Sequence, residues 1–135
     1  MATWDDVRRI ALGLPGTSEA PSHDGLAAWR VHERLFVWER PLRTADFAAL
    51  GAAAPDGPIL DARVADEGVK EALLVEQPDV YFTTPHFDGY RAVLVRLEQI
   101  SVEDLEELIV EAWLDRAPKR LATEYLAAEN GHNSP

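Results

Sequence analysis

The turn His86-Phe87-Asp88-Gly89-Tyr90 contains the side chains best suited to holding a small ligand or an ion. We expect Gly89 to take a positive φ, which reverses the chain and leaves His86 and Asp88 on the same side. An imidazole that titrates near neutrality beside a carboxylate can share a ligand or a proton with it. Asp88-Gly89 is also an ordinary hairpin dipeptide. If the chain has a site for a small molecule or an ion, the sequence places it at His86, Asp88 and Tyr90; the alternative is a purely structural turn.

Two groups of basic side chains could contact phosphate. The first surrounds a predicted hairpin and consists of Arg30, Arg34, Arg40 and Arg43, and the second, Arg116, Lys119 and Arg120, heads the last predicted helix. Of the 13 basic residues 11 are arginine, whose planar guanidinium binds phosphate or carboxylate through two parallel hydrogen bonds. We take Arg30, Arg34, Arg40, Arg43, Lys119 and Arg120 as candidate nucleic-acid contacts. The alternative is that these charges only keep the protein soluble.

The sequence lacks the motifs that support the common kinds of catalysis. It has no cysteine, which excludes disulfides, thiolate metal sites and cysteine nucleophiles. No serine stands in a nucleophile elbow, no glycine-rich phosphate loop is present, and no two histidines have the spacing of a zinc-binding helix. The acidic residues Glu103, Asp104, Glu106, Glu107 and Glu111 are best explained as the solvated face of a helix. We therefore predict that the protein is not an enzyme and binds no cofactor or metal.

The aromatic residues allow two interpretations. Trp4, Trp29, Phe36, Trp38, Phe87, Tyr90 and Trp113 could stack on bases, as in proteins that bind single-stranded nucleic acid. Aromatic residues at helical or strand spacing more often form the core. Trp4 and Trp113 lie on apolar helical stripes, which favours the core for both. Phe87 and Tyr90 lie in a turn, where the pattern leaves both interpretations open.

The net charge of −11, from 13 basic and 24 acidic residues, opposes binding to a polyanion. The acidity is uneven, because residues 1–50 carry −1 and residues 51–135 carry −10. A locally basic face on the N-terminal half is compatible with this distribution. The absence of cysteine, of an apolar signal segment and of a run of about 18 apolar residues predicts a cytoplasmic protein without a membrane span.

Capping residues and apolar stripes predict helices at both ends of the chain and between the strands. The expected helices are Thr3–Leu14, Thr44–Leu50 capped by Thr44, Asp66–Glu76 with Val69, Ala72 and Leu73 inward, a helix capped by Ser101, and Pro118–Asn130. Thr3 with Asp6 and Ser101 with Asp104 form capping boxes. The chain length predicts one domain over residues 1–130, with residues 131–135 as a flexible tail.

Short runs of β-branched and aromatic residues predict strands. The runs are Thr17–Ser22, Leu26–His32, Leu35–Arg40, Ile59–Val64, Val80–Thr83 and Tyr90–Leu97. Alternation places Trp29 and Val31 on one face of the hairpin's first strand, and Phe36 and Trp38 together on one face of its second. Because hairpins are grouped between helices, we predict an α+β fold with a curved, largely antiparallel sheet of five or six strands.

Several segments together resemble the MmcQ/YjbR family. They are DDVRRIALGLPG, WRVHERLFVWE, PHFDGY, AVLVRL and EELIVEAWLDRAPKRL, within residues 5–122. The resemblance, to an actinobacterial-type branch, implies a bacterial cytoplasmic protein with helices packed on one face of the sheet, as in secretion chaperones. It also implies a "double wing" mode of DNA binding, in which Leu26–Arg40 is one β-hairpin wing and the second lies around Val80–Leu97. No catalytic residue is implied.

Two functions of different classes follow. The first is a non-enzymatic binding module with DNA as its named ligand, motivated by the resemblance and by the arginine-bearing hairpin. The second is a protein- or peptide-binding module, a monomer or weak homodimer, whose acidic C-terminal half steers a basic partner. A continuous positive strip on the surface favours the first, and an acidic surface with a large apolar patch favours the second.

Overall fold

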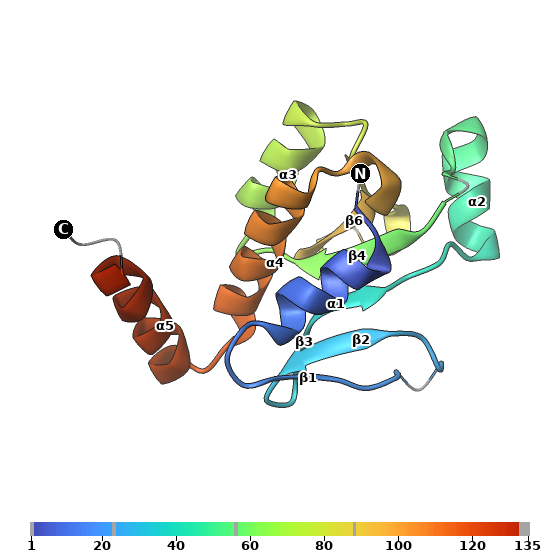
Figure 1. Cartoon of the computed structure of the whole chain (residues 1–135). Coiled ribbons are helices and arrows are strands. Elements are labelled where there is room, and N and C mark those ends of the chain that lie inside the picture. The colour runs from blue at the N-terminus through green and yellow to red at the C-terminus, as the bar shows by residue number, and fades with distance from the viewer. Residues whose placement is uncertain (1, 23, 56, 88, 133–135) are drawn as a thin grey trace.

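The computed structural model describes residues 2–22, 24–55, 57–87 and 89–132 and is built on a six-stranded sheet (Figure 1). The strands are β1 (Thr17–Glu19), β2 (Ala28–Val31), β3 (Arg34–Glu39), β4 (Ile59–Arg63), β5 (Tyr81–Phe82) and β6 (Ala92–Arg96). Their order is β1-β2-β3-β4-β6-β5, and every neighbouring pair is antiparallel. The predicted α+β fold with an antiparallel sheet is confirmed.

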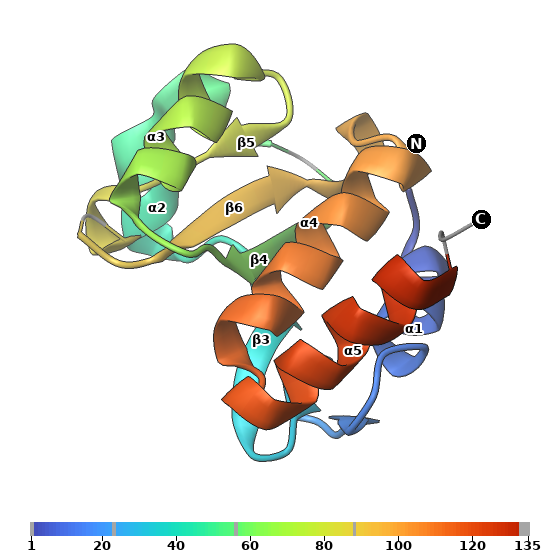
Figure 2. The same cartoon turned by 90° about the vertical axis from the view of Figure 1, so that its left-hand side faces the viewer.

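The helices are α1 (Trp4–Leu12), α2 (Thr44–Leu50), α3 (Glu67–Glu76), α4 (Val102–Arg116) and α5 (Lys119–His132), with three short 3₁₀ turns, η1 (Gly51–Ala53), η2 (Pro85–Phe87) and η3 (Leu97–Gln99). Helices α1 and α4 cross one face of the sheet, while α2 and α5 lie at opposite ends of the molecule (Figure 1). Figure 2 shows α3 beside β5 at the far edge of the sheet. None of the described helices has the length and apolar content needed to cross a membrane.

The main core lies between the sheet and α1 and α4. Leu60 and Ala62 of β4 point into it together with Leu105 and Ile109 of α4. Trp113 is fully buried there, and its indole Nε1 donates to the Pro15 carbonyl at 3.0 Å. The core interpretation of Trp113 is thus confirmed.

A β-bulge changes which side chains of β3 share a face. Trp29 pairs with Val37 but the next residue, Arg30, pairs with Leu35, so Phe36 is the extra residue of the bulge. Phe36 and Val37 are both fully buried in the main core, while Trp38 points to the other face of the sheet. The prediction that Phe36 and Trp38 lie on the same face is therefore wrong, whereas Trp29 and Val31 do share the core face.

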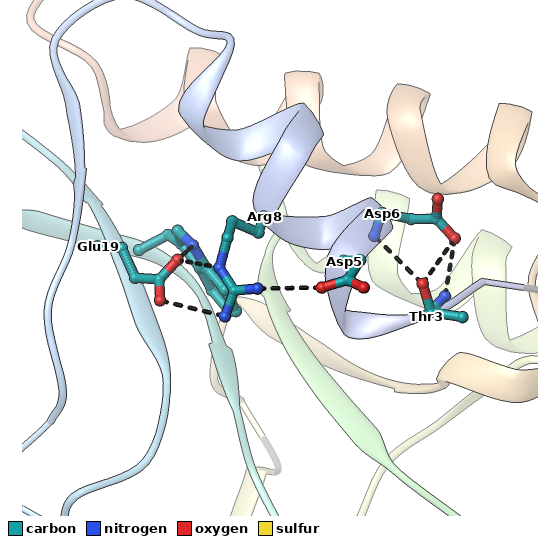
Figure 3. Close-up of polar contacts among 6 residues, drawn as sticks. Thr3, Asp5, Asp6, Arg8 and Glu19 are labelled. Carbon is teal, nitrogen blue, oxygen red and sulfur yellow. Dashed lines mark hydrogen bonds and ion pairs between the residues drawn. The ribbon is translucent and has the colours of Figure 1, made fainter.

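Helix α1 is fixed by a polar network that also reaches β1 (Figure 3). The predicted capping box is confirmed, because Thr3 Oγ1 accepts from the Asp6 amide and Asp6 Oδ2 accepts from the Thr3 amide. Arg8 bridges Asp5 at 3.1 Å and Glu19 at 2.8 Å. Glu19 also accepts a hydrogen bond from Trp29 Nε1 at 2.9 Å. This network ties the edge strand β1 to the first helix.

Replacing Glu19 by Gln should lower the free energy of unfolding by about 1 kcal/mol at pH 7, because the amide loses the ion pair with Arg8. The Arg8 hydrogen bond, followed by that of Trp29, holds the pKa of Glu19 below its usual value against the effect of burial. Stability from such a group is present above the unfolded-state pKa and is lost as the pH falls through the folded-state pKa. Urea unfolding should therefore show the deficit at pH 7 and its disappearance in acid. Glu71→Gln, on the exposed side of α3, is the control and should show no deficit at either pH.

Candidate functional site

On the face of the sheet turned away from α1 and α4, the structure forms a groove of about 750 Å³ that we call the arginine groove. Its lining comes from the loop before β2, from β2 and β3, from the segment after β3 and from the turn before β6. The lining residues are Ser22, Asp24, Leu26, Arg30, Leu35, Trp38, Glu39, Arg40, Pro41, Arg43, Phe87 and Tyr90. Strand alternation explains the placement, because Arg30 and Trp38 point away from the face that buries their neighbours Trp29 and Val37. The groove therefore combines three arginines with three aromatic rings.

The three arginines of the groove differ in how strongly they are held. Arg40 is only 6% exposed, since its guanidinium pairs with Asp46 at 3.2 Å and donates to the Pro41 carbonyl. Arg43 Nη2 lies 3.5 Å from the Asp24 carboxylate, and both side chains are exposed. The side chain of Arg30 forms no hydrogen bond or ion pair with any residue that the structure describes. Arg30 and Arg43 are thus the charges available to a ligand, and Arg40 is part of the wall.

Asp46 anchors the segment that carries Arg40 and Arg43. Its Oδ2 accepts from the Arg43 amide at 2.9 Å, so Arg43 is the N-cap of α2, and the prediction that Thr44 caps this helix is wrong. Burial acts to raise the pKa of Asp46, but the Arg43 amide and the Arg40 charge together hold it below its usual value. The carboxylate therefore remains ionised and fixes Arg40 in place.

Further arginines extend the positive charge beyond the groove. Arg63 lies with its guanidinium carbon 5.4 Å from the centre of the Tyr90 ring, and its Nε lies 3.7 Å from Asp115. Arg116 donates to the carbonyl of Leu35 at 3.2 Å. Burial, followed by the charges of Arg63 and Arg34, lowers the pKa of Arg116. Arg34, Arg63 and Arg116 therefore form a second basic cluster next to the Tyr90 end of the groove.

The aromatic turn of the groove is held by a buried lysine. Lys70 is the buried residue of α3, and its ammonium donates to the carbonyls of Phe87 at 2.7 Å and Tyr90 at 2.8 Å. The Phe87 and Tyr90 rings meet edge to face at 5.9 Å. Gly89 between them has the predicted positive φ, at 74°. Because Lys70 fixes both ends of this turn, Tyr90 can be 46% exposed without being loosely held.

Lys70 is the residue of this site that the sequence pattern missed. The pattern predicted Val69, Ala72 and Leu73 as the inward positions of α3. Leu73 does pack, half-buried, against the main core, but Val69 and Ala72 are exposed. Helix α3 is rotated about its own axis, relative to the predicted orientation, so that Lys70 faces the sheet. A lysine inside a helix is by default assigned to the surface, and no local signal in the sequence corrects that assignment.

Beneath the groove lies a carboxylate that is fully buried. Asp61 of β4 stands opposite Trp38 of β3 and Leu94 of β6, and it is 0% exposed. Neither of its oxygens has a hydrogen-bond partner among the described residues. Burial raises the pKa of Asp61 well above its usual range, against the charges of Arg40 and Lys70. The sheet beneath the groove thus contains a buried carboxyl group whose pKa is raised by burial.

The comparisons with known proteins agree with this fold. The YjbR family model matches residues 12–114, which is most of the chain. The chain belongs to the YjbR family. Uncharacterised proteins of Mycobacterium bovis and Mycobacterium tuberculosis are 60% identical over 130 residues, covering 94% of this chain and 98% of each relative. The crystal structure of a Deinococcus radiodurans protein with a DUF419 domain is similar with a TM-score of 0.63 and 23% identity, over 84% of this chain and 78% of that one.

In this YjbR-family chain the predicted basic residues divide into two sets. Arg30, Arg40 and Arg43 come together in the groove, and Arg34 joins the adjoining cluster. Lys119 and Arg120 do not line the groove; both are exposed at the start of α5, where Arg120 pairs with Glu124 at 3.3 Å. The placement of Lys119 and Arg120 thus gives no support to their predicted role in the same site.

The predicted ligand turn is described only in part. Tyr90 lines the groove, but Asp88 lies outside the described residues and only the backbone of His86, in η2, is described. A pairing of His86 with Asp88 stays a prediction. The segment that the resemblance implied as a second wing consists of the two-residue strand β5, η2 and β6. Its turn is tied to α3 through Lys70.

Proposed function

We propose that this YjbR-family protein is a non-enzymatic nucleic-acid-binding module and that the arginine groove holds the ligand. The observation that carries the proposal is the gathering of arginines on one face of a protein whose net charge is −11. Arg30 and Arg43 supply the accessible charges, and both have the planar geometry that binds phosphate. The aromatic rings between and beside them provide surfaces for bases.

The groove is far less acidic than the chain as a whole. Arg30, Arg40 and Arg43 line it together with the acids Asp24 and Glu39, and Arg40 is paired with Asp46. Much of the acidity lies elsewhere, for example on α3 and α4. Charges more than about 10 Å away are largely screened at 0.1 M salt, so the remote acids weaken binding less than the total charge implies.

A pair of double variants tests this proposal. Arg30→Ala with Arg43→Ala should weaken binding of a fluorescently labelled mixed-sequence oligonucleotide at least tenfold at low salt, because two phosphate contacts are lost. Lys119→Ala with Arg120→Ala removes the same charge from α5 and should change the affinity less than twofold. Fluorescence anisotropy, repeated over a series of salt concentrations, measures both the affinity and its salt dependence.

The proposal also predicts how the binding affinity depends on salt concentration. The slope of log affinity against log salt should fall by roughly 0.7 to 0.9 for each phosphate contact removed. If the two double variants lost affinity equally, the loss would be explained by the total charge of the protein. That result would contradict a binding site in the groove. Absence of binding by the unaltered protein at high micromolar concentration and low salt would contradict nucleic-acid binding altogether.

A second candidate, a module that binds a basic peptide, has its own supporting observation. A cleft of about 330 Å³ between α3 and α4 combines the apolar side chains of Val69, Leu73 and Leu108 with several acids, Glu76, Asp104, Glu107 and Glu111. Tyr81 lies in the same cleft, and burial, with the charges of Asp104 and Glu107, raises its pKa to about 12. A labelled peptide of alternating Lys and Leu should bind here if this candidate is correct, and Glu107→Gln with Glu111→Gln should abolish the binding.

A further inference from the structure

We propose that the ligand of the arginine groove is single-stranded nucleic acid, whose bases stack on Tyr90 and Trp38 while Arg30 and Arg43 contact the phosphates. This inference rests on the proposed nucleic-acid-binding function and narrows it from nucleic acid in general to unpaired strands. It depends on the shape of the groove, on the exposure of Tyr90 and on the placement of charge around the rings.

The first argument is shape. Proteins that read a duplex insert a projecting helix or β-ribbon into its major groove. Here the accessible arginine Arg30 and the rings of Trp38 and Tyr90 line a hollow of about 750 Å³. A hollow lined with aromatic rings accepts bases that have left the helical stack, whereas the bases of a duplex are already stacked on one another. The groove therefore suits an unpaired strand.

The second argument is that Tyr90 is both exposed and fixed. Among the large apolar and aromatic side chains that line the groove, Tyr90 is unusual in being 46% exposed. Its carbonyl accepts from buried Lys70, its ring meets Phe87 edge to face, and Arg63 lies over the ring at 5.4 Å. A ring held in this way loses little conformational freedom when a base stacks on it.

The third argument is the combination of charge and rings. Arg43 and Arg30 are accessible, and the rings of Trp38, Phe87 and Tyr90 share the same lining. Arg40 lies 5.3 Å from the centre of the Phe87 ring. Cations that follow the backbone, interleaved with rings that receive bases, are the usual composition of sites for single strands. A site that binds only phosphate requires the arginines, but it does not require aromatic rings.

Three probes of equal length separate these contributions: a single-stranded oligonucleotide, its duplex, and an abasic strand with the same phosphates and no bases. We expect the single strand to bind roughly tenfold tighter than either of the others, since stacking of one base typically contributes about that factor. Fluorescence anisotropy at low salt measures all three affinities. Stacking on Trp38 should also quench its fluorescence, and Trp38→Phe should remove that part of the quenching.

Variants of Tyr90 complete the test. Tyr90→Leu should weaken single-strand binding roughly tenfold while leaving binding of the abasic strand unchanged, and Tyr90→Phe should restore the affinity because it keeps the ring. Phe47→Leu is the matched control: Phe47, on α2, is 52% exposed and does not belong to the groove lining, so its loss should have no effect. Thermal unfolding of each variant verifies that it folds.

The outcomes distinguish the narrow inference from the broader function. Preference for the duplex, or equal binding of the abasic strand, would overturn single-strand stacking while leaving nucleic-acid binding in place. An unchanged affinity of Tyr90→Leu would likewise overturn it. Binding of none of the three probes would overturn both proposals, and binding of the Lys-Leu peptide alone would favour the cleft between α3 and α4.

Discussion

Lys70→Met should lower the free energy of unfolding by about 2–4 kcal/mol, a large part of the stability of a domain of this size. Methionine matches the length and apolar stem of lysine, so the packing changes little. The change removes two charge-assisted hydrogen bonds, to Phe87 O at 2.7 Å and to Tyr90 O at 2.8 Å. It also removes a positive charge that faces the buried Asp61. Chemical denaturation at pH 7 measures the loss.

The matched control for this prediction is Lys119→Met, because Lys119 is the other lysine of the chain and is exposed on α5. It should change the stability by no more than about 0.5 kcal/mol. Hydrogen exchange adds a local readout, since the Tyr90 amide donates to the Phe87 carbonyl that Lys70 also contacts. That amide should exchange faster in Lys70→Met than in the control. Equal stability of the two variants would mean that Lys70 does not hold the turn.

Local chemistry explains which parts of the fold could be predicted. The capping box of Thr3 and Asp6 and the shared face of Trp29 and Val31 depend only on neighbours a few residues apart, and both predictions are confirmed. The bulge at Phe36 depends on how β3 pairs with β2, which is a property of two strands together. No pattern within β3 alone marks the extra residue. The existence of β3 could therefore be predicted from the sequence, but not which of its side chains point to each face of the sheet.

The candidate site divides in the same way. Arg30, Arg40 and Arg43 could be grouped from the sequence because they flank one hairpin, and they do line one groove. Lys119 could not be excluded, because its position depends on the direction that α5 takes after α4. The ion pair of Arg40 with Asp46 joins residues six apart, at a spacing typical of no regular element. The prediction from the sequence therefore overestimated the accessible charge of Arg40. It did not include the Lys70 contacts, which no local pattern indicates.

Asp61→Asn should remove one contribution to the pH dependence of stability, namely the ionisation of Asp61. This carboxyl group is buried without a hydrogen-bond partner among the described residues. Burial raises its pKa in the folded state above the value near 3.9 expected in the unfolded chain. A raised folded-state pKa means that the folded protein holds the proton more tightly. The resulting stability is fully present below the unfolded-state pKa and is lost as the pH rises through the folded-state pKa.

The quantity to measure is the free energy of unfolding of the unaltered protein minus that of Asp61→Asn, from urea denaturation at a series of pH values. It should fall as the pH rises from about 4, with a limiting slope of about 1.4 kcal/mol per pH unit, because the amide cannot ionise. Asp6, Glu19 and Asp46 have lowered pKa values and act in the opposite direction, but they are present in both proteins. Their contributions largely cancel in the difference. Asp79→Asn, at an exposed position, should give a difference that does not fall over this range.

The alternative is that Asp61 stays ionised at neutral pH through the charges of Arg40, Lys70 and Arg63. The difference in stability would then rise with pH, because ionisation would stabilise the fold and removal of the charge would leave buried cations without a counter-ion. Arg40 already pairs with Asp46 at 3.2 Å, and Lys70 already donates to two carbonyls. Arg63 Nε lies 3.7 Å from Asp115. Because all three cations have other partners, their attraction for Asp61 is weaker than their charge alone indicates. We therefore expect the cost of desolvation to exceed the attraction and the difference to fall with pH.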